Sequence, residues 1–214
     1  SIAAVLRYSR SLGLASQLSV LIGLIILVGV HLQTSDPAVY WAELLEPVRV
    51  NLVDGGVVDE AGSQLLVGGI SRWMTGAFAA TFYFQVLIAL LIGRWWQAIL
   101  YNPGGFGDEF RAFRVHPALG FLGAACFMAF YLTDEVGWAA ELLLLLIPVF
   151  LLQGVALVHA LASTYQVRRG WLIGFYALLV VAMPHAEVLV AALGFADVWT
   201  DLRAKVRTRR DKKE

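Results

Sequence analysis

The stretch GAFAATFYFQVLIALLIG-RWWQ, residues 76 to 97, decides the fold class of this chain. Its apolar run from Gly76 to Gly93 approaches the length of about 20 residues that a helix needs to span a bilayer. Arg94, Trp95 and Trp96 follow at once. Amphipathic indoles and a guanidinium that reaches toward water are typical of the membrane–water interface. We therefore expect a transmembrane helix that ends here, with these three side chains as its interface anchors.

The composition of the whole chain favours a membrane protein over a soluble domain. Hydrophobic residues make up 59% of the 214 residues and charged residues only 15%, whereas soluble domains carry roughly 25% charged residues. The single cysteine, Cys126, lies in an apolar run, so an intrachain disulfide and a cysteine metal cage are excluded. The predicted fold class is all-α, a polytopic bundle of transmembrane helices.

Four further apolar segments are candidate spans. They are Leu14–Leu32, Pro117–Leu132, Trp138–Ala162 and Trp171–Leu193. The last is interrupted at Pro184, and a proline breaks a helix because it lacks an amide donor and clashes with the preceding turn. Residues 171–194 therefore form either one kinked helix that crosses once or a hairpin of two shorter helices that crosses twice.

The placement of charge favours the hairpin. Basic residues cluster near the N terminus, between residues 94 and 114, at Arg168 and Arg169, and in the tail 201–214, whereas most acidic residues fall in the alternate segments. Cytoplasmic segments carry the excess of Lys and Arg, and all four clusters share one side only if the last region crosses twice. We predict about six membrane helices with both ends cytoplasmic.

The domain organisation follows from this topology. Residues 1–200 are predicted to form a single transmembrane domain, and residues 201–214 a basic cytoplasmic tail that binds anionic lipid headgroups. Residues 37–70 are predicted to be an external amphipathic segment, because Asp36-Pro37 is a typical helix start and apolar side chains recur at helical spacing from Val39 to Leu52. Asp59–Ile70 is expected to begin a second short helix that leads into the next span.

The cytoplasmic loop 97–115 carries the candidates for docking a partner protein, because its charged residues suit a short interfacial helix. These candidates are Tyr101, Asn102, Phe106, Asp108, Arg111 and Arg114. On the same side, Arg168, Arg169 and Trp171 are further interface anchors. Nucleic acid is not an expected partner, since the basic tail lacks interleaved aromatic residues.

Polar side chains inside the apolar segments form a second set of candidates. His159 and Ser163 share one helix face, and Gln153 lies almost two turns earlier. A polar group in hydrocarbon needs a partner, so these side chains either bond to other helices or line a pocket for a small solute. Glu187 adjoins the break at Pro184, and broken helices often surround transporter sites; an outer-surface turn is the alternative.

Other chemistry is sparse. His31 and His185, each near an outer helix end, are a conceivable haem pair. No metal-binding spacing and no Ser/His/Asp or Cys/His arrangement occurs. We predict a protein that is not an enzyme and that has no metal and no cofactor.

Three segments resemble the YybS-like family of uncharacterised bacterial multi-pass membrane proteins. They are Arg94–Phe106 with Glu109-Phe110, Leu151–His159, and Leu193–Arg203. The resemblance implies the inner membrane of a bacterium and a bundle distantly similar to the substrate-binding subunits of energy-coupling-factor transporters. Members of the family are longer at the N terminus, so it also implies that this chain is a C-terminal part. The family has no catalytic residues to transfer.

Three functions remain open at this stage. The first is a small-solute-binding or transport-related membrane subunit, with Gln153 and His159 in its polar lining. The second is a scaffold or accessory subunit of a larger complex, which docks through Tyr101–Arg114 inside and through the Tyr40–Leu52 helix outside. The third is a b-type haem membrane protein.

Overall fold

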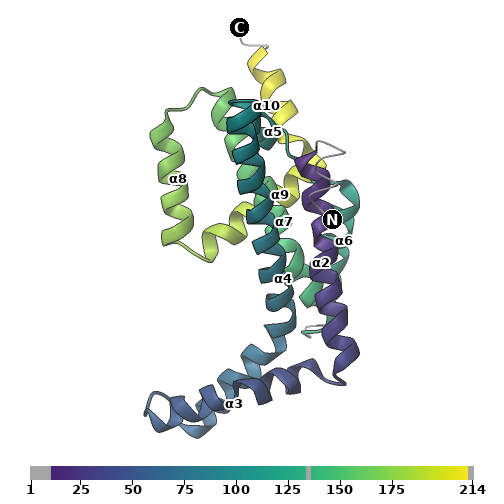
Figure 1. Cartoon of the computed structure of the whole chain (residues 1–214), viewed down its shortest axis with the longest axis vertical. Coiled ribbons are helices and arrows are strands. Elements are labelled where there is room, and N and C mark those ends of the chain that lie inside the picture. Colours follow the sequence, from purple (N-terminus) through teal and green to yellow (C-terminus); the bar gives the residue numbers. More distant parts are fainter. Residues whose placement is uncertain (1–10, 134–135, 212–214) are drawn as a thin grey trace. The chain divides into compact units, whose positions relative to one another are not determined.

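The computed structural model describes residues 11–133 and 136–211, and these residues form nine α-helices and no β-strand. The helices are α2 (Leu12–Gln33), α3 (Pro37–Asp54), α4 (Glu60–Tyr101), α5 (Gly105–Arg111), α6 (Pro117–Thr133), α7 (Trp138–Thr164), α8 (Arg169–Val181), α9 (His185–Thr200) and α10 (Leu202–Asp211) (Figure 1). The predicted all-α class is confirmed.

Three of these helices, α2, α4 and α7, are long and apolar enough to cross a membrane. The bent pair α8–α9 makes a fourth candidate if it is counted as one span, and α6 is apolar but only 17 residues long. By length and composition, the described residues therefore contain three to four candidate spans of a multi-pass membrane protein. The larger count of about six stays a prediction.

The longest helix, α4, is continuous over 42 residues, where the sequence suggested a separate helix over 59–70 and a span that ends at Gly93. The separate helix over 59–70 was wrong, because Glu60–Tyr101 is a single helix. Where the span ends within that helix stays a prediction, since length and composition alone identify it as a candidate. The helix stops at Tyr101, just before Asn102-Pro103-Gly104, where Gly104 adopts a φ of 88°. At 1.5 Å per residue, α4 is about 63 Å long, roughly twice the hydrocarbon thickness.

The predicted break at Pro184 is confirmed. Helix α8 ends at Val181 and α9 begins at His185, with a cis peptide between Met183 and Pro184. The two helices bend by 118° at this point (Figure 1). They are thus neither collinear, as in one kinked span, nor antiparallel, as in an ideal hairpin.

Two compact units divide the chain. Of the described residues, unit 1 holds 11–19, 84–122 and 146–211, and unit 2 holds 20–83, 123–133 and 136–145. The charged residues are divided between the units, because every described Lys and Arg except Arg49 and Arg72 belongs to unit 1. The described acidic residues of unit 2 are Asp36, Glu43, Glu46, Asp54, Asp59, Glu60 and Glu141.

In unit 1, α7 and α9 touch through their backbones. A Cβ added at Gly194 would lie 1.9 Å from the carbonyl oxygen of Phe150, and one added at Gly154 would lie 2.0 Å from that of Val190. Small residues at such a crossing allow close packing between helices in a membrane. The edge-to-face rings of Phe150 and Phe195, 5.2 Å apart, extend this contact.

In unit 2, α3 begins at Pro37 as expected, because the Asp36 carboxylate accepts hydrogen bonds from the amides of Ala38 and Val39. Trp41 is the one buried residue of α3, and its indole nitrogen donates to the Thr75 hydroxyl of α4 at 2.8 Å. This bond attaches an otherwise exposed amphipathic helix to the unit.

Candidate functional site

Residues 112–116, called the connector from here on, join α5 to α6 within unit 1. They contain no helix beyond a turn at Ala112. Phe113 and Val115 are buried, whereas Arg114 and His116 are exposed. A non-helical backbone must find partners for its amides and carbonyls elsewhere, and in this chain it finds them on side chains from distant helices.

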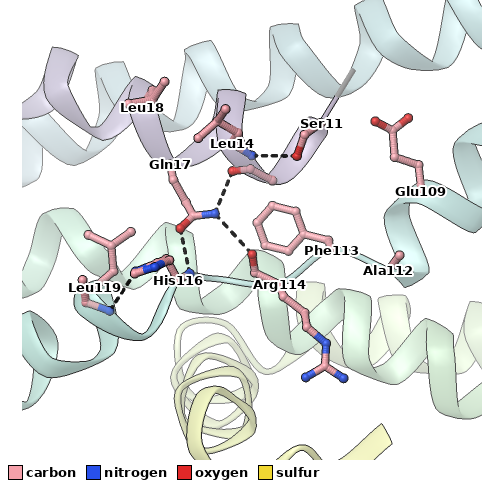
Figure 2. A pocket seen from close by; sticks show the side chains of 12 residues that line it. Ser11, Leu14, Gln17, Leu18, Glu109, Ala112, Phe113, Arg114, His116 and Leu119 are labelled. Atoms are coloured by element: carbon pink, nitrogen blue, oxygen red, sulfur yellow. Dashed lines mark hydrogen bonds between the residues drawn. The ribbon is translucent and has the colours of Figure 1, made fainter. Parts of the chain in front are cut away.

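The first of these side chains is Gln17 of α2. Its amide nitrogen donates to the Arg114 carbonyl at 3.2 Å, and its amide oxygen accepts from the His116 amide at 2.7 Å. The same nitrogen also bonds to the Gly13 carbonyl in its own helix at 2.9 Å. Figure 2 shows Gln17 lying between the start of α2 and the connector.

The second is Gln153 of α7, which is 1% exposed. Its amide oxygen accepts from the Val115 amide at 2.5 Å, and its amide nitrogen donates to the Asp197 carboxylate of α9 at 3.2 Å. Both ends of this side chain are therefore occupied by internal partners. Gln153 acts in the structure as a bridge from α9 to the connector.

The third is Arg203 of α10, which donates from Nη1 to the carbonyls of Arg111 and Phe113, both at 2.8 Å. Its Nη2 lies 3.4 Å from the Asp197 carboxylate, which is fully buried and also accepts from the Leu202 amide. Burial lowers the pKa of Arg203, while the negative charge of Asp197 raises it. The first turn of the predicted tail is thus locked into unit 1.

Glu109 of α5, the helix that precedes the connector, bonds to both α4 and α2. Its carboxylate accepts from Arg94 Nε of α4 at 2.6 Å and from the Leu12 amide of α2 at 3.1 Å. Arg94 also donates to the neighbouring Gln97. The guanidinium expected to anchor the membrane interface therefore also holds α5 in place.

An open pocket of about 590 Å³ adjoins these residues. Polar groups in its lining come from Ser11, Gln17, Glu109, Arg114 and His116 (Figure 2). The surrounding surface is mostly apolar. A pocket of this size falls in the range of roughly 300–1,000 Å³ that is usual for small-molecule sites.

The predicted docking residues lie within α5 or within four residues of its ends, in unit 1. Tyr101 is 82% exposed, and Asn102 and Asp108 are exposed as well. Phe106 is half-buried against Phe110. The exposed side chains before and within α5 therefore offer an aromatic ring, an amide and a carboxylate.

The two docking arginines are held by carboxylates. Arg111 pairs with Asp108 at 2.6 Å, and Arg114 pairs with Asp201 at 2.5 Å. The hydrogen bond from Arg114 is the main reason that the pKa of Asp201 lies below its usual value. Both pairs are partly exposed, so each contributes at most about 1 kcal/mol.

The four solute-pocket candidates are not joined to one another. His159 bonds through Nε2 to the Tyr176 hydroxyl of α8 at 2.7 Å and packs edge-on against Phe110. Ser163 is exposed, and Glu187 is half-buried in the first turn of α9. Within residues 11–133 and 136–211, no side-chain hydrogen bond connects any two of these residues with each other or with Gln153.

The remaining anchor and haem candidates are placed separately. Arg168, Arg169 and Trp171 are exposed at the start of α8, and His185 is exposed at the start of α9. In unit 2, His31 Nε2 is 2.6 Å from the Glu141 carboxylate, and its ring stacks on Trp138 at 3.9 Å. The described part of the chain holds no group of three or more potential metal ligands.

The pair of His31 and Glu141 should stabilise unit 2 measurably. Glu141 is 4% exposed, and replacing Glu141 by Gln exchanges a charge-assisted hydrogen bond for a neutral one, which costs about 1–2 kcal/mol. We expect a lower melting temperature in detergent, measured by tryptophan fluorescence. Glu43→Gln, at an exposed position of α3, is the control, and equal melting of the two variants would contradict the assignment.

Two residues of the network, Asp197 and Arg203, were not candidates from the sequence. The sequence pattern that could have indicated them is a carboxylate, Asp197, one turn before the end of an apolar helix, with an arginine, Arg203, six residues later. Charged groups at such positions are usually paired. Gln17 was not a candidate from the sequence either.

Comparisons with known proteins assign neither a family nor a fold relative to this chain. A scan against protein-family models, a search of curated proteins and a search of solved structures each find no match. The chemistry of the site is therefore interpreted from the residues themselves.

Proposed function

We propose that this chain is a non-enzymatic accessory or scaffold subunit of a larger membrane complex. It docks a partner protein through α5, the connector and the neighbouring Tyr101-Asn102 pair. The observation that carries the proposal is that Gln17, Gln153 and Arg203, from three distant helices, each form at least one hydrogen bond with the connector backbone.

This arrangement suits docking because the connector is already ordered before a partner binds, so binding costs little conformational entropy. A flexible segment loses conformational freedom when a partner binds, whereas a segment that is already fixed loses little. Tyr101 is exposed at the end of α4, before α5, and tyrosine is among the residues that dominate binding energy at protein interfaces. A fixed backbone with an exposed aromatic residue is a favourable docking surface.

The topology that we propose places this surface in the cytoplasm of a bacterium, at its inner membrane. The excess of basic residues in unit 1 supports that side. The bonds from Arg203 to the end of α5 and to the connector support a hairpin, since a single crossing of residues 169–200 would carry α10 to the side opposite α5. With α8 and α9 each crossing once, we propose about six membrane helices.

The docking proposal is tested by affinity purification from native membranes with mass spectrometry. The unmodified chain should retain a stoichiometric membrane partner. The pair Tyr101→Ala/Asn102→Ala should lower the retained amount about tenfold, the effect of losing about 1.4 kcal/mol. Tyr131→Ala, which removes an aromatic ring exposed to a similar degree on α6, should change nothing. A chain that purifies alone would contradict the proposal.

A solute-binding role is the second candidate, and the pocket of about 590 Å³ is the observation that favours it. The YybS-like resemblance, which stays a prediction, points the same way. A metabolite present at 100 times its dissociation constant would stabilise the fold by about 2.7 kcal/mol. His116→Ala, which removes an exposed side chain from the pocket lining, should abolish that thermal shift. Failure of every metabolite to stabilise the unmodified chain would exclude this role.

A further inference from the structure

Helix α4 carries an amide in the middle of its apolar segment. Gln85 lies between Gly76 and Gly93, about 12–14 Å of helix from either end. Its side chain is exposed, and it has no hydrogen-bond partner among the residues that the structure describes. In hydrocarbon, no water is present to bond this amide, so leaving it unpaired costs free energy.

The neighbouring residues on this helix face are small. Ala89 and Gly93 follow Gln85 one and two turns later, and both are exposed. A Cβ added at Gly93 would meet no atom within 4 Å. Ile88 and Ile92, also exposed, flank them. Small residues beside a polar one are typical of faces where two membrane helices approach closely and exchange hydrogen bonds.

We infer that the face of Gln85, Ala89 and Gly93 binds α4 of a second copy of this chain. A carboxamide carries both donors and an acceptor, so it is complementary to itself. Two copies inserted in the same orientation are related by a two-fold axis along the membrane normal, which places Gln85 opposite the same residue of its partner. The two amides then satisfy each other, which no lipid chain can do.

This dimer goes beyond the proposed docking function and is independent of it. Its surface lies within α4, whereas docking uses Tyr101 and the connector. Loss of the dimer therefore leaves capture of the partner by Tyr101 unchanged, and loss of that capture leaves the dimer intact. The two proposals fail separately.

The test is disulfide cross-linking of the full chain in native membranes, in a Cys126→Ala background. Ala89→Cys should form a disulfide-linked dimer on mild oxidation. Phe84→Cys, at an exposed position about 100° around the helix from Gln85, should not. Adding Gln85→Leu should weaken association about 3- to 30-fold, whereas Gln85→Asn, which keeps an amide, should retain more of the cross-link.

Several outcomes would overturn the inference. They are equal cross-linking at positions 84 and 89, no dimer at position 89, a cross-link to a different protein, and a dimer that is indifferent to Gln85→Leu. A dimer stabilises the folded chain by mass action, so the melting temperature of Gln85→Leu is compared with that of the unmodified chain in dilute detergent, where both are monomeric. The two values should match there, since the amide has no partner within its own chain. A lower value for Gln85→Leu in the monomer would show that Gln85 has an internal role and would count against the inference.

Discussion

Replacing Gly194 by alanine should destabilise unit 1 by at least about 3 kcal/mol, and replacing it by leucine should prevent the unit from folding. The added Cβ would stand 1.9 Å from the Phe150 carbonyl. Overpacking a core usually costs about 1–3 kcal/mol because side chains can shift. The obstacle here is backbone, so α7 and α9 must separate instead. Gly154→Ala should act in the same way.

Melting temperatures in detergent, followed by intrinsic fluorescence, measure this effect. A loss of about 3 kcal/mol corresponds to a fall of roughly 6–12 °C in a protein of this size. The matched control is Gly174→Ala in α8, where a Cβ meets no atom within 4 Å. That variant should melt at or above the temperature of the unmodified chain. Equal melting of Gly194→Ala and Gly174→Ala would show that α7 and α9 do not touch.

Replacing Asp197 by leucine is the second change with a large expected effect. It leaves the Arg203 guanidinium buried without its counter-charge, and breaking a buried ion pair by removing one partner costs about 3–5 kcal/mol. The connector should loosen as well, because Arg203 holds the Arg111 and Phe113 carbonyls. Capture of the docking partner should weaken in parallel with stability.

A double-mutant cycle separates this pair from its surroundings. Asp197→Leu combined with Arg203→Met should cost less than the sum of the single changes, since neither charge is then left buried alone. The exposed pair of Arg114 and Asp201 is the control, and its removal should cost at most about 1 kcal/mol. Strictly additive costs at Asp197 and Arg203 would contradict the network.

The parts of the fold that depend on local chemistry could be predicted from the sequence. Apolar length identified the long apolar helices that are candidate spans. The Asp36-Pro37 start and the break at Pro184 were found because capping and proline act on the nearest turn. The division of charge was also visible, because it needs only residue order. The continuity of α4 from Glu60 was missed, because the residues 59–70 were interpreted as a separate short helix before the span.

The site depends on pairs that are distant along the chain. Gln17 and the His116 amide are 99 residues apart, and Gln153 and Asp197 are 44 apart. Periodicity on one helix cannot report such pairs, because the partner belongs to another helix. The sequence therefore left Gln153 open between a bond to another helix and a pocket lining, and in the structure its amide bridges α9 and the connector.

Photo-cross-linking in living cells is the most direct test of the docking surface. A photoreactive phenylalanine analogue would replace Tyr101 in one variant and Tyr131 in another, because both tyrosines are strongly exposed. We expect a single defined membrane-protein adduct from position 101, weakened when Asp197→Leu loosens the connector, and no such adduct from position 131. No adduct at position 101, or the same adducts at both positions, would contradict a docking role for the connector.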